Sequence, residues 1–124
     1  MSDLVVGIDL GGTKLLGLAV DVERREVVAS GRVPTPTGSE AVLGAIVGLA
    51  EHLRAEVAGG GHRVTALGVG APGLVDRRGT LRYGPNVPGV VDLPLASMLG
   101  EHLGIPVAID NDATCAAWAE HELG

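Results

Sequence analysis

Short apolar runs separated by tight turns dominate the first third of the chain, a pattern typical of β-strands. Apolar runs cover residues 4–8 and 15–20 with Gly11-Gly12 between them, and a third segment, 26–33, ends at Pro34-Thr35-Pro36. Connections this short join neighbouring strands in antiparallel pairs. The pattern therefore predicts three antiparallel strands with a tight turn between the first two.

The hydrophobic period becomes helical after residue 39. Ser39 is a candidate N-cap, and apolar residues then recur at three- and four-residue spacing until the glycine run 59–61. The recurring apolar positions are Val42, Leu43, Ile46, Val47, Leu49, Ala50, Leu53 and Val57. We expect an amphipathic helix that the glycines end.

The second half of the chain alternates between strand and helix signals. Residues 64–69 and 107–109 predict buried strands, and residues 93–103 and 111–123 predict helices. Residues 70–89 hold three prolines and five glycines and predict a loop, with a small hairpin turning at Arg78-Gly79. The resulting order, βββαβαβα, indicates an α/β domain with a mixed sheet and helices on both faces.

Composition narrows the class of protein. The chain has 124 residues, 46% of them hydrophobic and 19% charged, which is typical of one globular domain. A net charge of −6 and the absence of a basic or aromatic stripe argue against nucleic acid as a partner. Cys115 is the one cysteine, so neither an internal disulfide nor a thiolate-rich zinc site can form. With no long apolar segment and no signal-peptide pattern, we expect a cytoplasmic protein that does not bind membranes.

The turn between the first two strands carries the first candidate chemistry. Its sequence is Asp9-Leu10-Gly11-Gly12-Thr13-Lys14, and Lys14 is the one lysine of the chain. Paired glycines let successive backbone N–H groups approach an anion without a Cβ in the way. Asp9 could hold a hydrated Mg²⁺ beside bound phosphates. The alternative is an ordinary hairpin turn whose glycines serve only positive φ angles.

A second candidate follows the last predicted strand, in Asp110-Asn111-Asp112-Ala113-Thr114. Ligands of open α/β sheets bind beyond the carboxyl ends of the strands, where these side chains fall. One alternative is that Asp110 or Asn111 only caps the following helix. A rival reading is the aspartyl nucleophile motif of haloacid-dehalogenase-type phosphatases, but no lysine follows Thr114 to support that chemistry.

Two further features carry weaker signals. Gly68-Val69-Gly70-Ala71-Pro72-Gly73 matches a dinucleotide-binding fingerprint, yet the turn-rich residues that follow predict no helix to bind the phosphates. Its glycines are better interpreted as a loop that lets the backbone approach a ligand. Asn86 is a candidate polar contact, although a loop asparagine is most often a turn former.

Together, four segments resemble the ROK family of sugar kinases and repressors, especially its glucokinase-like members. These are Asp9 to Lys14, Gly70-Ala71-Pro72-Gly73, Pro85-Asn86-Val87-Pro88-Gly89 and Asp110-Asn111-Asp112-Ala113. The resemblance covers the whole chain and implies an RNase H-like (actin-like ATPase) α/β domain. It also implies an ATP- and Mg²⁺-dependent kinase that phosphorylates a hexose, with glucose the first candidate.

The resemblance assigns roles by position. Asp112 resembles the catalytic base and a sugar ligand, while Asn111, Asn86 and Gly73 resemble contacts to the sugar. The ATP phosphates would be bound by Gly7, Ile8, Asp9, Leu10, Gly11, Gly12, Thr13 and Lys14, with Mg²⁺ held at Asp9 through water.

The resemblance also implies missing parts. Family kinases are more than twice this length, and their second phosphate motif, adenosine pocket and zinc site belong beyond residue 124. We therefore expect residues 1–124 to be the N-terminal domain of a homodimeric kinase, inactive alone. A ROK-type transcriptional regulator and a non-catalytic sugar-sensing domain are the alternatives. N-acetylated hexosamines, mannose, fructose and allose remain open as substrates beside glucose.

Overall fold

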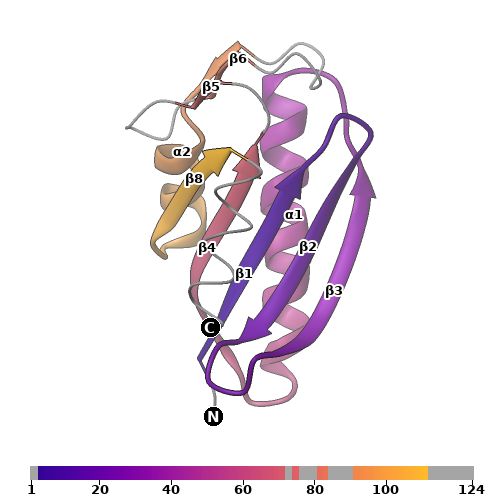
Figure 1. The fold of residues 1–124 in the computed structure, drawn as a ribbon, viewed down its shortest axis with the longest axis vertical. Helices are drawn as coiled ribbons and strands as arrows, with labels where there is room; N and C mark the ends of the chain where they lie inside the picture. The colour runs from indigo at the N-terminus through magenta and orange to yellow at the C-terminus, as the bar shows by residue number, and fades with distance from the viewer. Residues whose placement is uncertain (1–2, 72–73, 76–80, 84–90, 112–124) are drawn as a thin grey trace.

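The computed structural model describes residues 3–71, 74–75, 81–83 and 91–111. They form a mixed five-stranded sheet, a smaller antiparallel sheet and two helices (Figure 1). Within the described part of the chain, neither helix is long and apolar enough to cross a membrane.

The large sheet has the strand order β3-β2-β1-β4-β8. Its strands are β1 (Asp3–Leu10), β2 (Lys14–Asp21), β3 (Glu26–Pro34), β4 (Arg63–Ala71) and β8 (Val107–Asn111). Strand β2 pairs antiparallel with β1 and β3, whereas β4 pairs parallel with β1 and β8. The predicted combination of three antiparallel strands and later parallel crossovers is confirmed.

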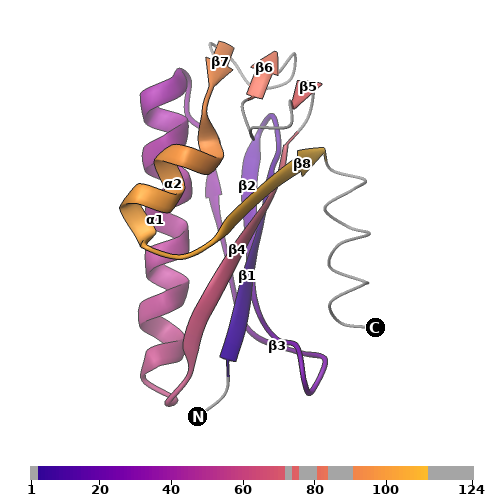
Figure 2. The ribbon, with the colours of Figure 1, turned by 90° about the vertical axis from the view of Figure 1, so that its left-hand side faces the viewer.

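Both described helices cover the same face of this sheet (Figure 2). They are α1 (Ser39–Ala58) and α2 (Leu95–Leu103). Alternate residues of β1 point toward them, so Leu4, Val6, Ile8 and Leu10 are buried while Asp3 and Asp9 are exposed on the opposite face. The helix predicted for residues 111–123 lies outside the described residues, apart from Asn111.

Two glycines of the sheet face leucine side chains of helix α1. A Cβ added to Gly17 on β2 would lie 2.9 Å from Leu53 Cδ1 and 3.0 Å from Leu49 Cδ2. A Cβ added to Gly31, the β3 partner of Gly17, would lie 3.2 Å from Leu49 Cδ1. These leucines pack directly against the glycine backbone, so a carbon added at either glycine would force the leucine side chains to shift.

The smaller sheet consists of β5 (Leu74–Val75), β6 (Leu81–Tyr83) and β7 (Val91–Leu93). It lies beyond the ends to which β1, β4 and β8 run (Figure 1). The antiparallel pairing of β5 with β6 agrees with a hairpin in this region, whereas the predicted turn residues Arg78 and Gly79 lie outside the described residues. The sequence pattern missed β7, because three residues are too few to show a period.

Several predicted boundaries were wrong. Helix α2 begins at Leu95 rather than residue 93, since residues 91–93 pair with β6. Ser39 is the first residue of α1 and makes no capping bond; the cap position belongs to Gly38, whose φ is 99°. Gly70 continues β4 instead of opening a loop, because it pairs with both neighbouring strands. Asn111 ends β8 and does not begin a helix, since it pairs with Ala71.

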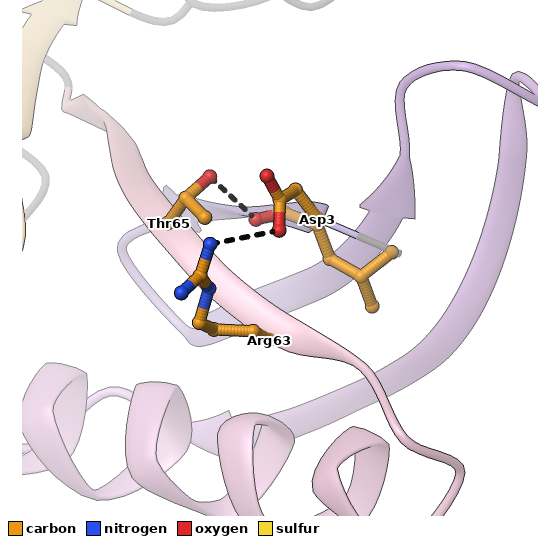
Figure 3. A network of polar contacts seen from close by, with 4 residues as sticks. Asp3, Arg63 and Thr65 are labelled. Atoms are coloured by element: carbon orange, nitrogen blue, oxygen red, sulfur yellow. Dashed lines mark hydrogen bonds and ion pairs between the residues drawn. The ribbon is translucent and has the colours of Figure 1, made fainter. Parts of the chain in front are cut away.

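The amino-terminal end of the sheet is tied by side chains between β1 and β4 (Figure 3). Arg63 Nη2 lies 3.3 Å from Asp3 Oδ1, and Thr65 Oγ1 donates to the Leu4 carbonyl oxygen at 3.3 Å. The register shifts here, because Leu4 pairs with Val64 while Val5 pairs with Ala66, leaving Thr65 as an extra residue. The Thr65 hydroxyl thus bonds a carbonyl at an irregular point of the ladder.

Candidate functional site

The turn between β1 and β2 is held by the end of β3. The Gly11 N–H donates to the Lys14 carbonyl oxygen at 3.1 Å, which closes one side of the turn. Thr35 follows β3 and makes two contacts: its Oγ1 donates to the Gly11 carbonyl oxygen at 2.7 Å, and its N–H donates to the Thr13 carbonyl oxygen at 3.0 Å. We call residues 11–14 the phosphate turn, after the role that the sequence predicts for them.

Sequence reasoning treated Thr35 only as punctuation between two prolines. The feature that could have indicated its role is a threonine between two prolines, Pro34 and Pro36, at the end of a strand. Its partners lie 24 residues away in the chain, so no local period reveals the contact.

A glycine is required at position 11 because the Lys14 carbonyl lies too close for a side chain, and not because the backbone there has a positive φ angle. Among the described glycines, positive φ occurs at Gly38, Gly61 and Gly104, so the expected alternative of a turn glycine serving positive φ does not apply to Gly11. A Cβ at Gly11 would lie 2.8 Å from the Lys14 carbonyl oxygen, which is closer than Cβ atoms approach other heavy atoms in proteins. Because the obstacle is backbone, only a change in the turn itself could relieve the clash.

Two backbone N–H groups of the turn have no backbone acceptor among the described residues. Within the described part of the chain, no backbone carbonyl accepts a hydrogen bond from the Gly12 or Thr13 N–H. Thr13 and Lys14 are exposed, and Gly12 is half-buried. An exposed cation beside unbonded amides is suited to an anion such as phosphate.

Asp9 lies beside this turn on the exposed face of the sheet. Strand β1 runs two residues further than predicted, so Asp9 is a strand residue flanked by buried Ile8 and Leu10. Its backbone partners are Leu16 on β2 and Gly70 on β4. The carboxylate is therefore held by a central strand and faces away from the two helices.

Strand register relates Asp9 to the second candidate segment. Asp9 pairs with Gly70, and Gly70 in turn pairs with Asp110 on β8. With neighbouring strands about 4.8 Å apart, the Cα atoms of Asp9 and Asp110 are separated by about 10 Å. Gly70 stands between them and contributes no side chain. Asn111 occupies the next register position, opposite Ala71.

Three of the predicted site residues are not described by the structure. Asp112, Gly73 and Asn86 lie outside the described residues, and their assigned roles stay predictions. Gly7 and Ile8 are placed in β1, two and one residues before Asp9.

The side chains around the turn can be compared with the ligands that Mg²⁺ and Zn²⁺, the two metals implied by the sequence, require. No group of three or more His, Cys, Asp or Glu side chains that could hold a metal occurs in the described ranges. Mg²⁺ needs no such cage, because it keeps several waters and takes one or two carboxylates together with substrate phosphates. The exposed Asp9 carboxylate beside open turn amides fits that requirement. The zinc site expected beyond residue 124 stays a prediction.

Replacing Gly11 by Ala is expected to destabilise the chain by about 1–3 kcal/mol, because the new Cβ overlaps the Lys14 carbonyl. Gly7→Ala on the same strand is the matched control, since no described atom lies within 4 Å of the added carbon. Urea unfolding of both variants measures the free energies. Equal stability of the two variants would contradict the close approach at Gly11.

The strand order, the parallel crossover and the glycine turn after β1 define an α/β domain of the actin-like ATPase class. Within this class, the sequence model described as the ROK family matches residues 5–124. The chain belongs to the ROK family.

Individual relatives agree with this assignment. The chain is 38% identical over 122 residues to a glucokinase from Streptomyces coelicolor, covering 98% of this chain but 36% of that protein. A ROK hexokinase structure from Thermus thermophilus matches 98% of the chain and 39% of its own length, with TM-score 0.83 and 45% identity.

A second solved structure is a ROK family glucokinase from Streptomyces griseus in complex with glucose and AMPPNP. It matches with TM-score 0.78 and 37% identity over 98% of this chain and 37% of that one. The chain therefore spans about a third of the length of these relatives. The similarity to sugar kinases includes all the elements described above.

Proposed function

We propose that residues 1–124 form the N-terminal domain of an ATP-dependent sugar kinase, which transfers the γ-phosphate of ATP to a sugar hydroxyl. The observation that carries this proposal is the phosphate turn near Asp9 at the end of β1, which combines the exposed Lys14 with amides that no backbone carbonyl of the described residues bonds. Register brings the start of the Asp110-Asn111-Asp112 segment to the same edge of the sheet. Family membership supports the same reading.

The turn residues bind and orient the nucleotide phosphates. The backbone N–H groups of residues 12–14 donate to phosphate oxygens, and the Lys14 side chain adds a mobile positive charge. Asp9 would hold a hydrated Mg²⁺, which supplies neutralisation of charge on the phosphates when it is bound. Phosphoryl transfer depends mainly on such positioning and electrostatic stabilisation.

The segment around the end of β8 handles the sugar in this proposal. Asp112 accepts the proton of the attacking sugar hydroxyl as general base. Asn111, Asn86 and Gly73 contact the sugar and select its hydroxyl pattern. Strand β8 supplies a rigid support for Asn111, since it pairs with β4 up to that residue.

Glucose and ATP are the first substrates to test. The Streptomyces griseus relative is described in complex with glucose and an ATP analogue, and the Streptomyces coelicolor relative is named a glucokinase. Since this chain spans 36% of the latter protein, we propose that it lacks turnover alone and contributes one wall of the site.

A coupled ADP-release assay with glucose tests the proposal in two forms. The isolated chain is expected to show no turnover above background. A chimera, in which this chain replaces the matching segment of the Streptomyces coelicolor glucokinase, is expected to phosphorylate glucose. N-acetylglucosamine, mannose, fructose and allose in parallel assays identify the preferred sugar.

Two results would overturn parts of this proposal. Turnover by the isolated chain in the ordinary kinase range of about 1–100 s⁻¹ would show that it is a complete catalyst. A folded chimera that binds nucleotide but phosphorylates none of the sugars would instead favour a regulator or a sugar-sensing domain.

A further inference from the structure

Thr35 joins the end of β3 to both sides of the phosphate turn, and no role in the reaction has been given to it above. We propose that Thr35 is a positioning residue, which sets the peptide planes of the turn so that the Gly12 and Lys14 N–H groups face the phosphates. This inference rests on the proposed function of the turn.

The two hydrogen bonds of Thr35 determine where two carbonyl groups point. The Gly11 carbonyl accepts from the Thr35 hydroxyl at 2.7 Å, and the Thr13 carbonyl accepts from the Thr35 N–H at 3.0 Å. In a planar trans peptide, the N–H of the next residue points opposite to the carbonyl. The Gly12 and Lys14 N–H groups are therefore both directed away from Thr35.

The Thr35 hydroxyl also keeps the turn from closing completely. In an ordinary two-residue hairpin, the carbonyl before the turn accepts from the N–H three residues later. Among the described residues, the Gly11 carbonyl has no such bond from Lys14, and its donor is the Thr35 hydroxyl instead. The bond from the hydroxyl thus directs the Gly11 carbonyl toward Thr35 rather than toward the Lys14 N–H.

Thr35 itself is well anchored for this task. Pro34, the last residue of β3, pairs with Lys14, and Pro36 follows Thr35 directly. The proline rings restrict the backbone on both sides of Thr35. Thr35 is half-buried, so its hydroxyl is partly shielded from competing water. The phosphate turn is thereby fixed before any ligand arrives, which lowers the entropic cost of binding.

The experiment compares Thr35→Val with Thr35→Ser in the 124-residue chain. Valine keeps the shape of threonine but removes the donor, whereas serine keeps the hydroxyl. The probe is inorganic triphosphate, followed by NMR at the Gly12 and Lys14 amides. Thr35→Val is expected to weaken binding about 10-fold, and Thr35→Ser less than about 2-fold. In addition, the ligand-free Thr35→Val chain should show altered Gly12 and Lys14 amide signals and slower exchange of the Lys14 amide.

Thr65→Val is the control for a merely structural effect. It removes a similar hydroxyl-to-carbonyl bond, to Leu4, at the other end of the sheet. Thr65→Val should lower stability without changing triphosphate affinity or the turn amides. Should Thr35→Val fail to fold, Thr35→Ala compared with Thr35→Ser gives the same contrast.

The outcomes separate this inference from the proposed function. If the original chain shows no triphosphate-induced shifts, the phosphate site proposed above is wrong, while the ligand-free amide signals still decide the role of Thr35. If Thr35→Val leaves both the ligand-free turn amides and the triphosphate affinity unchanged, the positioning role is overturned.

Discussion

Replacing Asp112 by Asn in the active chimera is expected to lower kcat for glucose phosphorylation by about 10²- to 10⁴-fold. Asparagine preserves size and hydrogen bonding to the sugar, but its amide cannot accept the proton of the attacking hydroxyl. The loss should therefore fall on kcat, with the KM values for glucose and ATP changed little. Steady-state kinetics in the coupled ADP-release assay measure both quantities.

Glu101→Gln provides the matched control for this prediction. It makes the same change of charge on an exposed residue of α2. Its kinetics should equal those of the unchanged chimera. If Asp112→Asn retains kcat within about threefold while the protein stays folded, Asp112 is not the base, and a non-catalytic role for the segment becomes the better reading.

Replacing Leu53 by Ala is expected to destabilise the isolated chain by about 2–5 kcal/mol. Leu53 is completely buried, and its Cδ1 packs against the backbone of Gly17. Domains of this size have a total stability of about 5–15 kcal/mol, so the variant should be close to unfolding. Urea denaturation followed by circular dichroism measures the change.

A double-mutant cycle with Gly17→Ala shows whether this close approach carries the effect. Gly17→Ala alone should cost about 1–3 kcal/mol by overpacking against Leu53 and Leu49. In the double variant the new methyl group fills part of the space that Leu53 vacates, so the combined cost should be smaller than the sum. Additive costs would contradict the contact.

Leu18→Ala is the control for Leu53→Ala. Leu18 lies on β2 next to Gly17, and its side chain is on the face of the sheet away from α1. Leu18 is 43% exposed, so removal of its side chain leaves no buried cavity. Its cost should be well under half that of Leu53→Ala. A comparable cost would indicate that the face of the sheet away from the helices is as well packed as the core.

Local pattern predicted most elements because burial imposes a period on the sequence. The alternation in β1 and the three- and four-residue spacing in α1 both follow from one face packing against a core. The wrong boundaries occur where a segment is too short to show a period, or where pairing with a distant strand sets the end of an element. Residues 91–93 form β7 because β6 lies beside them, and Asp110 and Asn111 extend β8 because β4 continues opposite them.

The candidate site also has parts that the sequence predicts and parts that only strand pairing sets. The glycine turn and the Asp110-Asn111-Asp112 segment could be found from residue types alone, since the chemistry of phosphate and sugar binding restricts which residues are useful. Their relation through Gly70 could not, because parallel strand register is set by pairing between distant segments.

The sequence by itself determined the class of domain, the place of the glycine turn between the first two strands and the family to which the chain belongs. Only the tertiary structure decided that Gly11 is excluded from bearing a side chain by the Lys14 carbonyl and that Thr35 holds the phosphate turn. The tertiary structure also brings Leu49 and Leu53 of α1 against the backbone of Gly17 and Gly31. Propensity and periodicity act over a few neighbouring residues, whereas these contacts depend on atoms from separate strands and helices that meet after folding.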